Sequence, residues 1–173
     1  MEFNIIVAIT LDGRIARSSE HQSTDWTSKE DALNMRAMLN ECDAIIVGRK
    51  TYDIATPLHK RNCIVFTGSV DSIQTISDKC VLFNAQKSSI KDYAQEKGYK
   101  KIAVLGGAQI YDYFLDNRLI DNLYLTVEPV VFGGGVSVFN QLQNINVLFE
   151  LVEFRKLNDR GSMLLHYKLN KSS

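Results

Sequence analysis

Two glycine-containing segments carry the groups that a phosphorylated ligand requires. In the first, residues 104–111 read Val-Leu-Gly-Gly-Ala-Gln-Ile-Tyr, so an apolar run ends at two glycines and an amphipathic helical pattern follows. Glycine lets a backbone approach a ligand closely, and the first turn of a helix offers free N–H groups to a phosphate. A tight turn between a strand and a helix would produce the same pattern, so this segment alone leaves both interpretations open.

The second segment, residues 45–52, reads Ile-Ile-Val-Gly-Arg-Lys-Thr-Tyr. Again an apolar run ends at glycine, and two cations and a hydroxyl follow it at Arg49, Lys50 and Thr51. Such groups bind phosphate oxygens through charge-assisted hydrogen bonds, although a solvated loop would also carry them. Two loops of this kind, at the carboxyl ends of neighbouring strands, indicate a nucleotide site more strongly than either loop does alone.

The elements that would position these loops follow from hydrophobic patterning. Met35, Met38, Leu39 and Cys42 share one face of a helix that begins near Ser28, and Ser28 followed by Asp31 resembles a capping box. Further helices are predicted at 88–97, ended by Gly98, and at 108–115. Short apolar runs typical of strands buried on both faces occur at 4–9, 44–47, 63–66, 81–83 and 101–105.

The last third of the chain has a different pattern. A long strand is predicted at 122–131, and the segments 149–157 and 163–169 flank Asn-Asp-Arg-Gly at 158–161, a hairpin signal. The sequence therefore predicts one α/β domain over residues 1–173. Its architecture would have three layers, α/β/α, around a mixed, mostly parallel sheet that ends in a C-terminal antiparallel hairpin.

Composition excludes several classes of function. Twenty basic and twenty acidic residues cancel, which argues against a nucleic-acid-binding face. No apolar run is long enough to predict a membrane span. The three histidines are too scattered to suggest a metal site. Each of the three cysteines adjoins an apolar stretch, so we expect buried free thiols in a reducing compartment and a cytoplasmic protein.

Together these motifs resemble the dihydrofolate reductase superfamily, which includes dihydrofolate reductases and the reductase domain of bifunctional riboflavin-biosynthesis deaminase/reductases. The resemblance runs from Ile6 to Leu169 and implies the dihydrofolate reductase-like fold. The segments that resemble the riboflavin-type domain are 10–16, 26–28, 43–48, 119–123 and 128–135. Those that resemble dihydrofolate reductase are 48–51, 61–67, 106–111 and 123–126.

The resemblance implies NADPH as the cofactor and assigns residues to it. Arg49 and Lys50 would meet the 2′-phosphate, and Thr67 and Ser69 would lie beside the adenosine. The pyrophosphate and the nicotinamide ribose would be held by Gly48, Thr51, Gly106, Gly107, Ala108, Gln109 and Ile110. The nicotinamide pocket would be lined by Ala8 and Ile15, with Tyr111 near the centre of hydride transfer.

The resemblance also implies a catalytic acid. Trp26 followed by Asp31 is similar to the tryptophan and acid of dihydrofolate reductase, so Asp31 would supply the proton, directly or through water, and Thr126 would hydrogen bond in the same cleft. An acid in the first turn of a helix also stabilises the helix dipole, and the two roles are compatible. Trp26, Ser28 and Arg61 would contact the substrate.

The substrate is left open by departures from both groups. Arg14 stands where the riboflavin-type domain usually has lysine, Leu105 where it usually has glutamate, and residues 52–57 replace its Asp-Asp-Pro segment. Conversely, Gly-Gly-Gly at 133–135 is not a dihydrofolate reductase feature. Three hypotheses follow: a riboflavin-type reductase acting on a ribosylaminopyrimidine phosphate, a dihydrofolate reductase, or a nucleotide-binding protein without significant turnover. The riboflavin-type relatives form dimers, so a homodimer is also expected.

Overall fold

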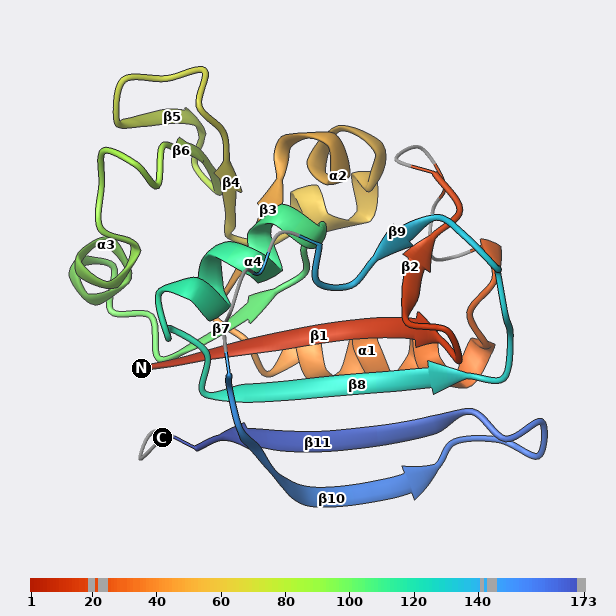
Figure 1. The fold of residues 1–173 in the computed structure, drawn as a ribbon. Helices are drawn as coiled ribbons and strands as arrows, with labels where there is room; N and C mark the ends of the chain where they lie inside the picture. Colours follow the sequence, from red (N-terminus) through yellow and green to blue (C-terminus); the bar gives the residue numbers. More distant parts are fainter. Residues whose placement is uncertain (19–20, 22–24, 141, 143–145, 171–173) are drawn as a thin grey trace.

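The computed structural model describes residues 1–18, 21, 25–140, 142 and 146–170. A mixed nine-stranded sheet lies at the centre of these residues (Figure 1). The order of strands across the sheet is β10-β11-β8-β1-β7-β3-β4-β6-β5. Their bounds are β1 Glu2–Thr10, β3 Ala44–Gly48, β4 Cys63–Phe66, β5 Ile73–Ser77, β6 Cys80–Phe83, β7 Lys101–Val104, β8 Asn122–Glu128, β10 Phe149–Lys156 and β11 Met163–Leu169. A separate two-stranded ribbon pairs β2 (Arg14–Ala16) with β9 (Val136–Ser137).

The strands from β8 to β6 run parallel, and antiparallel strands complete both edges of the sheet. At one edge β5 pairs antiparallel with β6, and at the other β11 pairs antiparallel with β8 and β10 with β11. The predicted mixed, mostly parallel sheet with a C-terminal antiparallel hairpin is thus confirmed. Because parallel strands point the same way, their carboxyl ends gather at one side of the sheet.

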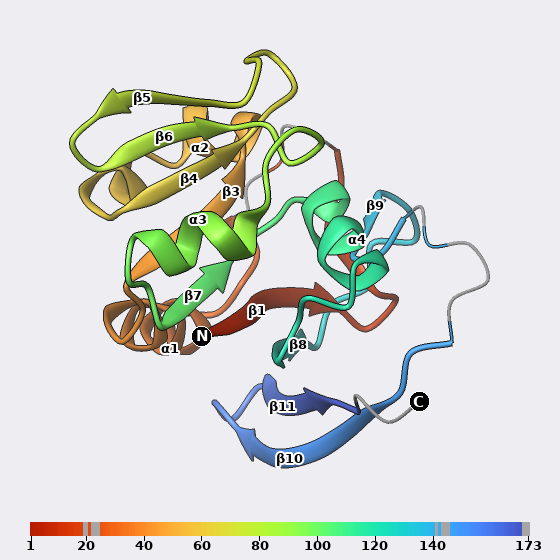
Figure 2. The ribbon, with the colours of Figure 1, turned by 90° about the vertical axis from the view of Figure 1, so that its left-hand side faces the viewer.

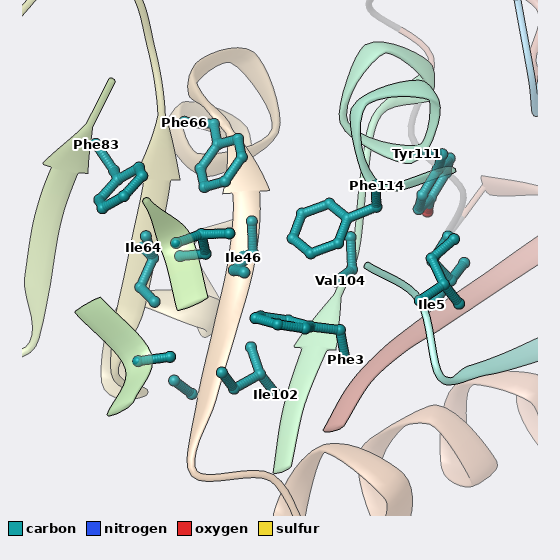
Figure 3. Packing of buried hydrophobic residues seen from close by; sticks show 14 of the residues in the cluster. Phe3, Ile5, Ile46, Ile64, Phe66, Phe83, Ile102, Val104, Tyr111 and Phe114 are labelled. Carbon is teal, nitrogen blue, oxygen red and sulfur yellow. The ribbon is translucent and has the colours of Figure 1, made fainter. Parts of the chain in front are cut away.

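Helices cover both faces of the sheet, which confirms the predicted three layers (Figure 2). The helices α3 (Ile90–Glu96) and α4 (Ala108–Asp116) pack on one face, where Phe3, Ile5 and Val104 point (Figure 3). The other face carries α1 (Lys29–Asn40), α2 (Arg49–Ile54) and the 3₁₀ helix η2 (Thr56–Lys60). Successive residues of a strand alternate between the two clusters because the side-chain period of a strand is two.

Several predicted helix ends lie where the structure has them. Ser28 caps α1 and Ser89 caps α3, each accepting a hydrogen bond from the backbone N–H three residues on, and Gly98 ends α3 with a φ of +70°. The strand predicted at 122–131 was too long, because β8 ends at Glu128 and Pro129 cannot donate to a sheet. The short elements β2, β5, β9, α2 and η2 were not predicted.

In the described part of the chain, no helix is both long enough and apolar enough to span a bilayer. Cys63 and Cys80 are buried and Cys42 is half-buried, all three as free thiols. The expectation of free thiols packed with apolar residues is therefore confirmed.

Candidate active site

The two glycine-containing loops lie against each other at the carboxyl ends of β3 and β7. The Gly48 backbone N–H donates to the Gly106 carbonyl at 2.8 Å. A Cβ at Gly48 would lie 3.6 Å from Ile110 Cγ1, so the first turn of α4 closes over this point. We refer to residues 48–51 and 106–110 together as the glycine corner. The structure thus brings together two segments that the sequence linked only by pattern.

Gly106 and Gly107 have different structural requirements. Gly106 has a φ of +86°, and a Cβ there would lie 2.5 Å from the Tyr111 ring, so only glycine fits. A Cβ at Gly107 would meet nothing within 4 Å among the described residues. Gly107 also precedes α4, whose first turn is not capped by any described side chain. The open space and the unused N–H groups in front of α4 fit a pyrophosphate.

Cationic and hydroxyl side chains surround the glycine corner. Arg49 and Lys50 are exposed at the start of α2, and the Arg49 Nε donates to both carboxylate oxygens of Asp53 at 2.9 and 3.0 Å. This pairing uses Nε, so the terminal guanidinium nitrogens can still face a phosphate. Beyond the end of β4, the Thr67 and Ser69 hydroxyls lie 3.0 Å apart, and Ser69 borders a depression of about 460 Å³ lined by residues 69–74.

A second group of residues lies where β8 and β1 end, beneath the first turn of α1. It comprises Ser28, Asp31, Thr126 and Glu128, and we refer to it as the acid corner. Ala8 pairs with Thr126 and Thr10 with Glu128 in the register of β1 and β8. Since β1 lies between β8 and β7, it separates the acid corner from the glycine corner. The half-buried Ala8 is therefore placed between the proposed acid and the proposed cofactor loops.

Asp31 is the buried acid of this corner, with an exposed fraction of only 7%. Burial raises its pKa, hydrogen bonds from the Thr126 and Thr27 hydroxyls act in the opposite direction, and the nearby Glu128 charge raises it further. A carboxyl group in this environment keeps its proton to higher pH than an ordinary aspartate. A raised pKa of this kind is what a general acid requires.

Glu128 was missed as a functional candidate, although it is still more deeply buried, with an exposed fraction of 3%. Its Oε1 accepts from the Ser28 backbone N–H at 2.8 Å and from the Ser28 hydroxyl at 2.7 Å, and its Oε2 accepts from the Ser162 hydroxyl. The predicted capping box is therefore only half correct. Ser28 caps Asp31, but Glu128, not Asp31, satisfies the Ser28 N–H. An acid that directly precedes Pro129 at a strand end was the available sequence signal.

Aromatic side chains lie beside the acid corner on the chain entering α1. The Trp26 ring meets Phe132 edge-on with centroids 5.2 Å apart, and the Arg17 guanidinium lies 4.1 Å from the Phe132 centroid. The Trp26 Nε1 is buried and has no hydrogen-bond acceptor among the described residues. A substrate atom entering beside it would satisfy this donor, in agreement with the predicted contact between Trp26 and substrate.

Three residues assigned by resemblance have other tasks in the structure. Arg61 donates to the Leu39 carbonyl and to Asn40 Oδ1, each at 2.6 Å, so it ties the end of α1 to the segment before β4, away from the strand ends that form the two corners. Tyr111 is buried below Gly106, where its ring supports the turn and faces the sheet (Figure 3). The Ser28 hydroxyl is occupied within the acid corner. Arg61 therefore lies outside the two corners, whereas Tyr111 and Ser28 lie within them and support their backbone; the predicted substrate contacts of Ser28 and Arg61 stay predictions.

Arg14 and Ile15 lie on the β2–β9 ribbon, which stands at the ends of β1 and β8 (Figure 1). Arg14 donates to the Ser137 hydroxyl and lies 3.9 Å from Asp12, which itself accepts from the backbone N–H groups of residues 132 and 133. Arg14 is thus used to hold β9 in place. Ile15 is half-buried and packs against the cluster that includes the α4 side chains, as a residue lining the nicotinamide pocket would.

A further cavity of about 160 Å³ lies apart from both corners. It is bounded by α1, β7, β8, β10 and β11, and its lining includes Lys101 at the start of β7 and His166. Burial lowers the pKa of His166, and Lys168 acts in the same direction while Glu153 opposes it. This cavity contains none of the predicted site residues.

The family of the chain follows from comparison with known proteins. Residues 2–144 match the family model described as dihydrofolate reductase, and the chain belongs to this family. The uncharacterised protein YwjB of Bacillus subtilis is 34% identical over 151 residues, which cover 81% of this chain and 83% of that protein. The uncharacterised protein YyaP of the same organism is 25% identical over 159 residues, 82% of each chain.

Solved structures place the chain in the same fold. A putative riboflavin biosynthesis protein from Shewanella sp. PV-4 has a TM-score of 0.77 at 20% identity, covering 99% of this chain and all of that one. A pyrimidine reductase-like protein from Corynebacterium diphtheriae also gives 0.77, at 16% identity, covering 98% of this chain and 92% of that one. The family model thus confirms the predicted kinship with dihydrofolate reductases, and the solved structures confirm the fold.

Proposed function

We propose that this protein is an NADPH-dependent reductase that transfers a hydride to a planar pyrimidine-type heterocycle. The observation that carries the proposal is the pairing of an open glycine corner with a buried Asp31, whose pKa is raised by that burial, on either side of β1. The cations of α2 and the uncapped start of α4 suit a phosphorylated dinucleotide.

Bound NADPH would supply the hydride, and the chain's own residues would supply position and a proton. The glycine corner would hold the pyrophosphate and the ribose, and Ala8 and Ile15 would face the nicotinamide. Asp31 would protonate the acceptor nitrogen, because a hydride added to a C=N carbon leaves negative charge there. Thr126, hydrogen bonded to Asp31, would hold the carboxyl in its orientation. Trp26 would cover the substrate.

The favoured acceptor is the pyrimidine of the riboflavin pathway, which makes the enzyme similar to 5-amino-6-(5-phosphoribosylamino)uracil reductase. The names of the two structural relatives support this choice, as does the riboflavin-type segment 128–135. Dihydrofolate is the second candidate, supported by the family model. Arg14 does not decide between them, since its guanidinium is engaged with Ser137.

The test is to follow NADPH absorbance with dihydrofolate and the riboflavin-pathway pyrimidine offered side by side. Consumption with the pyrimidine alone supports the riboflavin-type reductase, and consumption with dihydrofolate alone supports the second candidate. Tight NADPH binding without turnover on either substrate contradicts both and leaves the third hypothesis, a nucleotide-binding protein.

We also propose that the protein forms a homodimer through the edge strand β10. Its Leu151, Val152 and Phe154 are 51%, 51% and 64% exposed, which is unusual for a strand and leaves an unpaired backbone edge. Antiparallel pairing of β10 with its copy in the register that sets Leu151 opposite Phe154 also sets Glu150 opposite Arg155. Both pairs are favourable, one through apolar contact and one through charge.

Sedimentation measures this association directly. Phe154→Glu should yield a monomer, because it places a charge within the apolar contact. Leu33→Glu is the matched control, since Leu33 has the same exposed fraction of 64% and belongs to α1, not to the edge strand. A monomeric unmodified protein, or a dimer that survives Phe154→Glu, would contradict the proposed interface.

A further inference from the structure

Hydrogen bonds converge on the Glu128 carboxyl group. The Ser28 hydroxyl accepts from the Asp31 backbone N–H at 3.2 Å and donates to Glu128 Oε1. The Ser162 hydroxyl accepts from the Asn158 side-chain amide at 2.9 Å and donates to Glu128 Oε2. With the Ser28 N–H, Glu128 accepts at least three hydrogen bonds. Glu128 is therefore held at both carboxyl oxygens and in turn holds Ser28 in place.

Asp31 has a different environment from Glu128. Its partners are the two threonine hydroxyls, and among the described residues Glu128 is the charged group that acts on it. The other ionisable groups at the start of α1 face outward: Lys29 and Glu30 are exposed, and Glu30 pairs with Asn158 and feels Arg160. Burial raises the pKa of Asp31, and the charge of Glu128 raises it further.

We propose that Glu128 is a positioning residue of the reductase: through its hydrogen bonds to Ser28 it fixes the first turn of α1, and with it the place and the electrostatic surroundings of Asp31. This role rests on the proposed function, because it prepares Asp31 as the acid. Glu128 itself is shielded from substrate by Ser28 and Ser162. It also links the acid corner to the turn between β10 and β11, where Asn158 and Ser162 lie.

The effect of Glu128 on Asp31 is measurable without any substrate. Carboxyl ¹³C NMR on the unmodified protein should show Asp31 taking up its proton at higher pH than an ordinary aspartate, because burial raises its pKa. In Glu128→Gln, which keeps the side chain's shape, Asp31 should titrate at lower pH because its like-charged neighbour is gone. Glu41→Gln is the control: it removes a carboxylate at the far end of α1, paired with Lys101 at 2.7 Å, and should leave the titration of Asp31 unchanged.

Enzyme kinetics then distinguish a positioning role of Glu128 from a purely structural one. Glu128→Gln should lose up to about 100-fold in kcat near neutral pH, with its pH–rate profile displaced to lower pH and the KM for NADPH unchanged. Ser162→Ala removes one hydrogen bond and leaves the charge, so it should lower the melting temperature without moving the profile. An Asp31 titration that is identical in folded Glu128→Gln and in the unmodified protein overturns the proposal. A confirmed titration without turnover would contradict the reductase function alone.

Discussion

The glycine corner and the acid corner differ in how the chain builds them. The glycine corner consists of two continuous loops whose side chains and N–H groups largely face outward. The acid corner is closed, and it joins Ser28 to Glu128 across 100 residues of sequence. In the first, polar groups remain for a ligand. In the second, the polar groups largely satisfy one another, and Asp31 is left with hydroxyl partners and a repelling neighbour.

This difference indicates a division of tasks between binding and chemistry. An exposed corner can exchange its hydrogen bonds with water for hydrogen bonds to a phosphate at low cost. A buried carboxyl group, by contrast, changes its proton affinity in ways that solvent cannot screen. We therefore expect substitutions in the glycine corner to change cofactor affinity and substitutions in the acid corner to change the rate and its pH dependence.

The largest effect should follow from Asp31→Asn. The variant should bind NADPH normally but reduce substrate about 10²- to 10⁴-fold more slowly near neutral pH, because the proton donor is lost. Asparagine keeps the shape of the side chain and leaves Ser28 in place as the cap. A steady-state pH–rate profile of both proteins measures the effect. Residual activity should rise as the pH falls, and unchanged turnover would place the acid elsewhere.

The stability of the same variant relative to the unmodified protein should increase as the pH rises. The pKa of Asp31 is raised in the folded protein, first by burial, so its contribution to stability is complete below the ordinary aspartate range and is lost as the pH rises through the raised value. Asparagine carries no charge and avoids this loss. Denaturant unfolding at acid and at neutral pH should therefore show a difference that favours the variant only at neutral pH.

The adjacent glycines provide a sharper comparison within the glycine corner. Gly107→Val should weaken NADPH binding by about 1–3 kcal/mol, because bulk would enter the space proposed for the cofactor, while stability changes little. Gly106→Ala should instead destabilise the fold by about 1–3 kcal/mol, since its φ is +86° and a Cβ would meet Tyr111. Calorimetric binding beside a thermal melt distinguishes the two. Loss of stability in Gly107→Val would show that this glycine only forms a turn.

A smaller effect is expected from Arg49→Ala. Charge-assisted hydrogen bonds contribute about 1.5–3 kcal/mol, and the exposure of Arg49 and its pairing with Asp53 reduce that value, so we expect roughly tenfold weaker NADPH binding. Binding of NADH, which lacks the 2′-phosphate, should be unaffected. The ratio of the two dissociation constants is the quantity to measure. A variant that keeps the full ratio would exclude Arg49 as the selecting residue.

The two corners also differ in how far the sequence predicts them. The strands that bury both faces and the loops of the glycine corner were predicted, because each is a local pattern of apolar runs, glycines and cations. The acid corner was predicted only in part. Asp31 and Thr126 were found by resemblance, whereas Glu128 becomes visible only when β8 is paired with β1 and α1 is placed over both. The position of Arg61 just before the start of β4, outside both corners, was likewise not visible in the sequence, since no local pattern shows which end of a strand a cation will reach.

The elements that were not predicted are short or exposed. β5 is exposed along its whole length, so it lacks the apolar run by which the other strands were predicted. β2 and β9 are only three and two residues long, and they depend on Arg14 and Ser137 meeting across the ribbon. Such contacts between distant segments stabilise structure that propensity alone does not specify.

The most direct test of the proposed cofactor site is calorimetric titration of the unmodified protein with NADPH and with NADH. We expect saturable binding of both, with NADPH tighter by about tenfold or more. The 2′-phosphate adds contacts to Arg49 and Lys50, while the glycine corner holds the groups that the two cofactors share. Equal affinity for the two cofactors, or no saturable binding of either, would contradict the proposed site.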